Sequence, residues 1–124
     1  MTKEKALELI NIYGKAWETQ DTELVASIFT DDATYNDPME PENIGVDAIK
    51  EYWKYKVIGE QKNIKFNLKN IWMDGDTVIA EWNSRFDDIK RNINIDMIEV
   101  AIFAVKNDKF SSLREYYKDV KTAI

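Results

Sequence analysis

Apolar residues recur at spacings of three and four between residues 3 and 19, which places them on one face of a helix. Asp21 or Thr22 is a suitable N-cap for a second, short helix, and the pair Thr30-Asp31 is expected to end it. The apolar face of the first helix consists of Ala6, Leu9, Ile10, Tyr13, Ala16 and Trp17, and that of the second of Leu24, Val25, Ile28 and Phe29.

A short β-prone run from Ala33 to Asn36 predicts the first strand. An acidic loop over residues 37–45 then leads through Gly45 into a third helix, which is expected from Val46 to Lys56. Ile49, Tyr52 and Trp53 form the side of this helix that is expected to face inward.

From residue 63 onward apolar and polar residues alternate, so the second half of the chain is expected to consist of strands. Asp74-Gly75 is a hairpin signal, and Asn107-Asp108 is a second turn. The last two strands are expected at residues 92–105 and from Phe110 to Tyr117. Helices followed by antiparallel strands indicate the α+β class.

The strand at residues 92–105 is apolar on both faces. Ile98, Val100 and Ile102 form one apolar row, which predicts a second packed layer or a partner subunit; we expect a homodimer. Glu99 interrupts the other row. A buried Glu is expensive without a partner, so Glu99 is either a cavity residue or the partner of Arg85 or Arg114 across the sheet.

Composition and charge exclude several partners. The 124 residues suit one soluble domain, and the net charge of −6 without a basic run argues against nucleic acid. The amino-terminal segment MTKEKALELINIYG is too charged for a signal peptide or a membrane span, so no membrane is expected and the cytoplasm is the expected location.

The residue types that are missing restrict the chemistry further. Without Cys there is no thiolate nucleophile or thiolate zinc site, and without His the commonest general base and most transition-metal ligands are missing. No glycine-rich phosphate loop is present, so neither a metal nor a cofactor is expected. Acid–base chemistry must therefore use Asp, Glu, Tyr or Lys. The four Trp, six Tyr and five Phe suit either a lined pocket or an ordinary core.

Asp37 lies between the first predicted strand and Pro38. The proline disfavours helix at residue 37 and keeps its backbone extended. A carboxylate on such a segment beside aromatic residues is a candidate for a perturbed, functional acid. The alternative is an acid that only ends the strand and forms a turn.

Four segments carry a resemblance to a known family. They are the run TDDATYNDP, the stretch from Gly45 to Trp53, the run AEW at residues 80–82 and the closing run KFSSLREYYKD. In this order the chain resembles the nuclear transport factor 2-like superfamily and, within it, the SnoaL-like group. The resemblance implies a cone-shaped curved mixed β-sheet wrapped around three N-terminal helices, a deep pocket and frequent dimerisation. It does not fix the function.

Ketosteroid isomerase is the first enzyme of the superfamily that permits a comparison by residue. Its tyrosine in the first helix and its base aspartate before a proline match Tyr13 and Asp37. The isomerase's second, protonated acid falls near Ala101 in this chain, and Glu99 lies two residues earlier on the same face. The resemblance thus implies proton transfer with a phenol donor.

Limonene epoxide hydrolase is the second enzyme of the superfamily that permits a comparison by residue. Tyr35, Asp37 and Glu115 stand where that enzyme's water-positioning residues would be. Its Arg-x-Asp pair, which serves the epoxide, is replaced by Trp82 and Ser84.

From these comparisons we expect a single SnoaL-like domain whose hydrophobic pocket takes a small apolar molecule for isomerase, cyclase or hydrolase chemistry. The alternative is a noncatalytic ligand-binding or association module of the same fold. The expected catalytic residues are Asp37 as the base, Tyr13 or Tyr35 as the donor, and Glu115. The expected ligand-binding residues are Trp17, Trp53, Trp82, Met97, Glu99 and Phe103.

Overall fold

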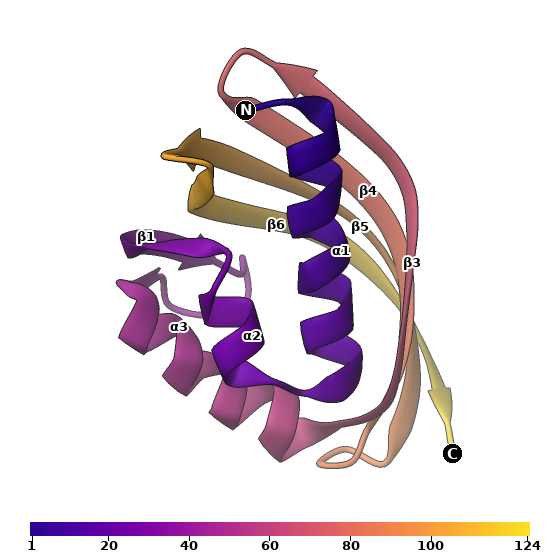
Figure 1. Cartoon of the computed structure of the whole chain (residues 1–124). Helices are drawn as coiled ribbons and strands as arrows, with labels where there is room; N and C mark the ends of the chain where they lie inside the picture. The colour runs from indigo at the N-terminus through magenta and orange to yellow at the C-terminus, as the bar shows by residue number, and fades with distance from the viewer.

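Three helices pack on the concave side of a strongly curved sheet in the computed structural model, which describes residues 1–124 (Figure 1). Two strands of the sheet lie between the second and the third helix in the chain. The long helix α1 lies along the concave face of the sheet, and its apolar face is buried there as its spacing predicts (Figure 1). The helices are α1 (Lys3–Thr19), α2 (Thr22–Ala26) and α3 (Val46–Trp53). None is long and apolar enough to cross a membrane.

Local capping sets the bounds of α1 and α2. The side chain of Thr2 accepts a hydrogen bond from the Lys5 amide at 3.1 Å, and Gln20 ends α1 in the left-handed conformation. Asp21 then caps α2 by accepting from the Leu24 amide at 3.0 Å. These contacts confirm the expected first helix and the cap of the second.

The predicted extent of the second helix is wrong. The helix ends at Ala26, and strand β1 (Phe29–Asn36) begins four residues before the expected Ala33. Phe29 pairs with Phe110 in parallel register and is fully buried, so sheet pairing prevails over the helical spacing at this position. Ile28 and Phe29 are buried as expected, but outside the helix.

Helix α3 passes directly into a π-helical turn, η1 (Lys54–Ile58). The third helix was expected to continue as a regular helix to Lys56. The α-helix instead ends at Trp53, and the wider π-helical turn follows. A π-helical turn contains more residues per turn than an α-helix, and here it presents Lys56 and Val57 toward a cavity on the concave side of the sheet.

The six strands form one mixed sheet in the order β2-β1-β6-β5-β4-β3. Only the β1–β6 pair is parallel. The Asp74-Gly75 and Asn107-Asp108 turns lie where expected, and Asn107 and Asp108 both have positive φ, as tight hairpin turns require. The other strands are β2 (Asn43–Ile44), β3 (Gln61–Asp74), β4 (Thr77–Asp88), β5 (Ile93–Lys106) and β6 (Lys109–Ala123).

Strand β6 continues six residues beyond its expected end at Tyr117. Residues after Tyr117 are mostly exposed and polar, so no apolar alternation identifies them, and it is pairing with β5 that orders them, up to Ile93 with Ala123. This extension lengthens the wall of the sheet on the side of the cavity.

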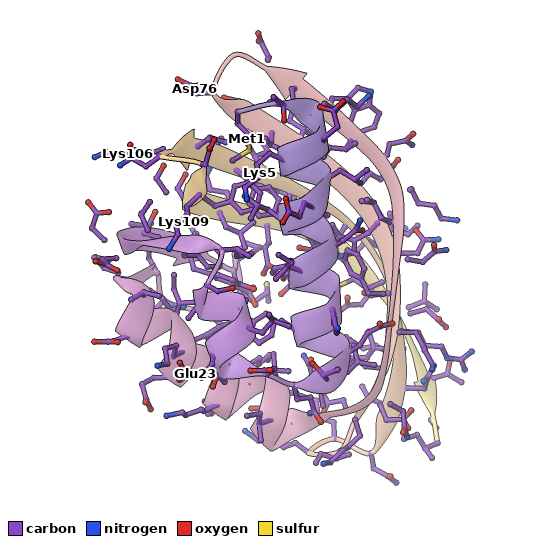
Figure 2. All side chains as sticks on the ribbon, viewed as in Figure 1. Met1, Lys5, Glu23, Asp76, Lys106 and Lys109 are labelled. Atoms are coloured by element: carbon purple, nitrogen blue, oxygen red, sulfur yellow. The ribbon has the colours of Figure 1, made fainter.

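The core lies between α1 and the concave face of the sheet, where side chains fill the space (Figure 2). A Cβ on Gly14 would collide with the Phe66 ring, so the glycine permits the close approach of α1 to β3. On the outer face of β5, Ile98 is 57% exposed and Val100 and Ile102 are half-buried. The architecture confirms the predicted α+β cone.

Candidate functional site

A cavity of about 310 Å³ opens between α1, α3 and the concave face of β4, β5 and β6. Its volume is at the lower end of the range for small-molecule sites. Its aromatic lining residues are Tyr13, Trp17, Tyr35, Tyr52, Trp53, Phe86 and Tyr117, and its acidic ones are Asp37, Glu60, Asp88, Glu99, Glu115 and Asp119.

Glu115 is the centre of a buried hydrogen-bond cluster. Tyr13 of α1 and Tyr35 of β1 each donate from the hydroxyl to Glu115 Oε1 at 3.0 Å, and the two hydroxyl oxygens are 3.1 Å apart. The side chains meet because alternation along β6 turns Glu115 to the concave face, which α1 covers. Burial raises the pKa of Glu115 to about 7, although Glu99 and the two tyrosines, which donate to it, counteract the rise.

Glu99 lies beside this cluster and is 3% exposed. It forms no ion pair with Arg85 or Arg114: Arg85 instead contacts Asp96 at 3.8 Å on the outer face, and Arg114 is exposed. Burial first, and then the negative charge of Glu115, raise the pKa of Glu99 well above its ordinary value. Glu99 is therefore protonated near neutral pH and donates to Glu115, while its Oε2 accepts no hydrogen bond.

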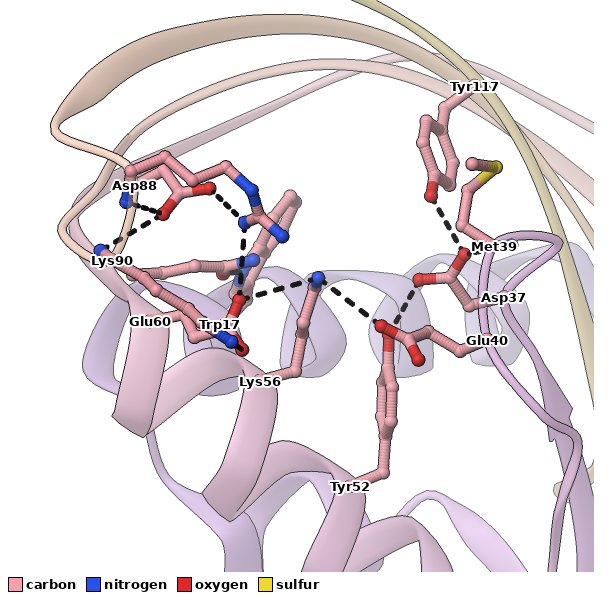
Figure 3. A network of polar contacts seen from close by, with 12 residues as sticks. Trp17, Asp37, Met39, Glu40, Tyr52, Lys56, Glu60, Asp88, Lys90 and Tyr117 are labelled. Carbon is pink, nitrogen blue, oxygen red and sulfur yellow. Dashed lines mark hydrogen bonds and ion pairs between the residues drawn. The ribbon is translucent and has the colours of Figure 1, made fainter.

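Asp37 is held by three donors immediately after β1. Tyr52 donates to Oδ2 at 2.6 Å, and Tyr117 donates to Oδ1 at 2.8 Å (Figure 3). The Met39 amide donates to Oδ1 at 2.9 Å, which makes Asp37 a turn-forming residue as well. Asp37 is 5% exposed and lines the cavity, so the residue that forms the turn also contributes a carboxyl group to the cavity wall.

The two tyrosines that hold Asp37 remain protonated donors. Burial first, and then the charge and hydrogen bonding of neighbouring groups including Asp37, raise the pKa of Tyr52 and of Tyr117. Sequence reasoning named neither as a site residue. The available signals were that Tyr117 alternates in phase with Glu115, and that Tyr52 shares the inward side of α3 with Ile49.

The expected ligand-binding residues divide into two groups. Trp17, Trp53, Met97 and Glu99 line the cavity. Trp82 and Phe103 do not: both are fully buried in the core behind it. The Trp82 ring centroid is 5.3 Å from that of Tyr13, and the Phe103 ring stacks on Phe110 at 4.2 Å. Alternation along β4 and β5 places Trp82 and Phe103 on the concave face, but α1 covers that part of the sheet.

A network of ion pairs surrounds the mouth of the cavity. Lys56 Nζ lies 3.5 Å from Glu40 Oε1 and 3.6 Å from Glu60 Oε1 (Figure 3). Arg91 Nη1 lies 2.6 Å from Asp88 Oδ2 and 3.5 Å from Glu60 Oε1. Sequence reasoning did not identify this network, because its members come from the loop after β1, from η1 and the residues directly after it, from β4 and from the turn before β5. These segments meet only in the folded chain.

No group of three or more acidic side chains is arranged to hold a metal ion. The carboxyls of the cavity instead accept from tyrosines, from backbone amides or from one another. The arrangement can take up a proton at one carboxylate and release one from another, at separate points of one water-poor cavity.

Comparisons with known proteins agree with this fold. Residues 11–113 match the family model of the SnoaL-like domain. No curated protein gives a significant match.

Solved structures support the same assignment. A nuclear transport factor 2-like protein from Anabaena variabilis superposes with a TM-score of 0.83 at 20% identity, covering 98% of this chain and 92% of that one. An LEH-like epoxide hydrolase from M. tuberculosis superposes with a TM-score of 0.76 at 16% identity, covering 93% and 84%. The epoxide hydrolase/cyclase-like enzyme SalBIII, which has a role in pyran ring formation in salinomycin, gives 0.78 at 20% identity, covering 94% and 92%. At these identities the likeness concerns the fold.

Proposed function

Because the chain belongs to the SnoaL-like domain family, we propose that its cavity carries out cofactor-free proton transfer on a small, largely apolar organic molecule, as an isomerase or a cyclase does. One observation carries this proposal: Asp37 and Glu99 line the same cavity, but one is a carboxylate held by three donors and the other is a buried, protonated acid. Carboxyl groups with such different environments are suited to the separate tasks of base and acid.

Asp37 is the base in this proposal. A carboxylate offers about four lone-pair positions, and those of Oδ1 accept from Tyr117 and Met39 whereas Oδ2 accepts only from Tyr52. Oδ2 therefore keeps one free position, whose direction the three donors fix. A substrate C–H adjacent to a carbonyl gives its proton to this oxygen, and the electron pair moves to the carbonyl oxygen.

Glu99 supplies the complementary acid. When the substrate is bound, the Glu99 hydroxyl turns its hydrogen bond from Glu115 to the substrate oxygen on which negative charge develops, while Tyr13 and Tyr35 continue to donate to Glu115. Asp37 then returns the proton to another carbon of the substrate, so an isomerisation leaves the protein in its starting protonation state. Each of these groups is built into a regular element or fixed by hydrogen bonds.

Epoxide opening is less well supported. Trp82 and Ser84 occupy the positions of the Arg-x-Asp pair of limonene epoxide hydrolase, and neither of them lines the cavity. No acid therefore stands where the epoxide oxygen would be protonated. The proposal is limited to carbon acids such as ketones and related carbonyl compounds.

Exchange of α-protons in D₂O tests the proposal with simple ketones in place of the natural substrate. A panel of small hydrophobic ketones is incubated with the protein, and deuterium uptake is followed by NMR. We expect at least one ketone to exchange, and Asp37→Asn to slow that exchange by about a hundredfold. Asp96→Asn, which changes an exposed acid on the outer face of β5, is the matched control and retains the activity.

A different outcome would favour the noncatalytic module. If ketones raise the melting temperature but none exchanges faster than in buffer, the cavity binds without a catalytic step. Equal exchange by the native protein and Asp37→Asn would remove Asp37 from the mechanism.

A further inference from the structure

We propose that the ligand of this cavity carries a positively charged amine or quaternary ammonium group, which the Glu99 and Glu115 carboxyls neutralise and the surrounding aromatic rings enclose. The inference deepens the proposed function and rests on it, since it concerns the same cavity and names the class of substrate. It can nevertheless be tested by binding alone, without turnover.

The charges of the cavity are unbalanced at its inner end. The lining contains three basic residues, and two of them are engaged at the mouth: Lys56 with Glu40 and Glu60, and Arg91 with Asp88 and Glu60. The third, Lys121, is exposed. Neither Glu99 nor Glu115 forms an ion pair, although both are buried. Buried acids are normally paired with a cation, so the protein leaves this position open to one.

An unpartnered oxygen of Glu99 supports the inference independently of the charge imbalance. Glu99 is only 3% exposed, and its side chain lines the cavity. Its Oε2 nevertheless accepts no hydrogen bond from any group of the protein. Glu115 differs, because both Tyr13 and Tyr35 donate to its Oε1. An unpartnered buried oxygen is unfavourable unless something else contacts it, and an ammonium group is a suitable contact.

The walls suit an alkylated cation better than a hydrated metal ion. Pairs of rings lie close together around the acids: the Tyr13 and Trp53 centroids are 5.7 Å apart, and those of Tyr35 and Tyr52 are 5.4 Å apart. Ring faces attract cations within about 6 Å of the centroid and also bury methyl groups. Aromatic walls that surround a carboxyl pair combine the two interactions that a methylated ammonium requires.

Cation binding is coupled to a proton in this arrangement. Near pH 7 Glu115 is partly protonated, and an incoming cation favours its ionised form, so binding releases the Glu115 proton, while Glu99, whose pKa lies well above its ordinary value, keeps its own. The affinity must therefore rise as the pH rises through about 7, the pKa of Glu115. The other titratable groups that line the cavity are Tyr13 from α1, Tyr35 from β1, Asp37 after β1, Tyr52 from α3, Lys56 from η1, Glu60 after η1, Asp88 from β4, Arg91 before β5, and Tyr117, Asp119 and Lys121 from β6.

Isothermal titration calorimetry with two isosteric probes tests the inference. Choline carries a trimethylammonium group, and 3,3-dimethylbutan-1-ol replaces its nitrogen with carbon. We expect choline to bind the native protein at pH 8 roughly tenfold or more tightly than the alcohol. The choline affinity should fall as the pH is lowered to 6, whereas that of the alcohol should not change. The enthalpy should depend on the buffer, because a proton is released.

A charge-removing variant and a matched control complete the design. Glu99→Gln with Glu115→Gln keeps the shape and the tyrosine hydrogen bonds and should abolish the preference for choline. Glu81→Gln makes the same change on β4, outside the cavity lining, and should retain the preference. If the double variant does not fold, the pH series on the native protein replaces it.

Three results would overturn the inference. They are equal or weaker binding of choline than of the alcohol, no saturable choline binding up to about 10 mM, and a choline affinity that is independent of pH. The outcomes remain separate from those of the exchange assay. Choline selectivity without any exchange would contradict only the proposed proton transfer, and exchange without selectivity would contradict only the cation.

Discussion

Neutralising Glu115 should remove a pH-dependent loss of stability. Its pKa is raised from 4.5 to about 7 in the folded protein, so between these values the folded state holds a proton that the unfolded state has released. The contribution of this group to folding is therefore complete below about pH 4.5 and is lost as the pH rises toward 7. A pKa difference of about 2.5 corresponds to a loss of about 3 kcal/mol in the free energy of unfolding.

Glu115→Gln provides the test because glutamine has nearly the same shape and does not titrate. Its amide oxygen can still accept from Tyr13 and Tyr35, as Glu115 Oε1 does. Urea denaturation followed by tryptophan fluorescence at pH 5 and pH 8 gives the free energy of unfolding of both proteins. We expect the variant to gain about 2–3 kcal/mol relative to the native protein between the two pH values.

Other titrating groups limit the comparison but do not reverse it. Burial acts to raise the pKa of Asp88, but Arg91 holds that pKa below its ordinary value, so the stabilising effect of Asp88 is lost only in more acidic solution, below the chosen range. Burial raises the pKa of Asp119, which acts in the same direction as Glu115. Both remain in the variant, so the difference reports the Glu115 site together with the part of the Glu99 pKa shift that the Glu115 charge causes. Parallel curves for the two proteins between pH 5 and pH 8 would refute the argument.

Other parts of the molecule give three further predictions. Asp37→Asn should leave the unfolding midpoint nearly unchanged while slowing turnover about a hundredfold, and a variant that loses structure by circular dichroism would contradict the assignment. Gly14→Ala should destabilise the fold by about 1–3 kcal/mol, because the added methyl collides with the Phe66 ring; an unchanged melting curve would show that the ring moves freely. The exposed row that includes Ile98 and the half-buried Val100 should form the interface of a homodimer, so Ile98→Lys should shift sedimentation from dimer to monomer, and a monomeric native protein at high concentration would disprove this interface.

Sequence periodicity was sufficient for elements with one clear apolar face. The spacing in α1 and the alternation in β4 are local properties, and the structure buries the residues that they indicate. The α2–β1 boundary failed because Phe29 satisfies a helical spacing and a strand equally well, and only its pairing with Phe110 decides between them. The end of β6 failed for a related reason, since its last residues are ordered by β5 and have no apolar pattern of their own.

The site could be predicted only where chemistry left a mark in the sequence. Asp37 was indicated by the following proline, and Glu99 by its place in an apolar row. Whether Trp82 faces a cavity or a helix depends on how far α1 covers the sheet. Alternation along a strand predicts the face on which a residue lies, but it does not predict what covers that face. The three donors to Asp37 come from separate segments of the chain, and only the folded backbone brings them together.

The two-residue turn at Asn107-Asp108 controls the chemistry of the cavity from a distance. It pairs Lys106 with Lys109, and after a one-residue shift in register between Val105 and Ala104 the pairing continues until Ala101 lies opposite Glu115. One residue inserted into this turn would shift the phase of β6 and send Glu115 to the outer face, leaving Glu99 without its partner. Length variation in a surface loop is usually tolerated, but here it would exchange the inner and outer faces of the strand that carries Glu115. Relatives whose turn differs in length by one residue should therefore carry their acidic residue at a position of opposite parity.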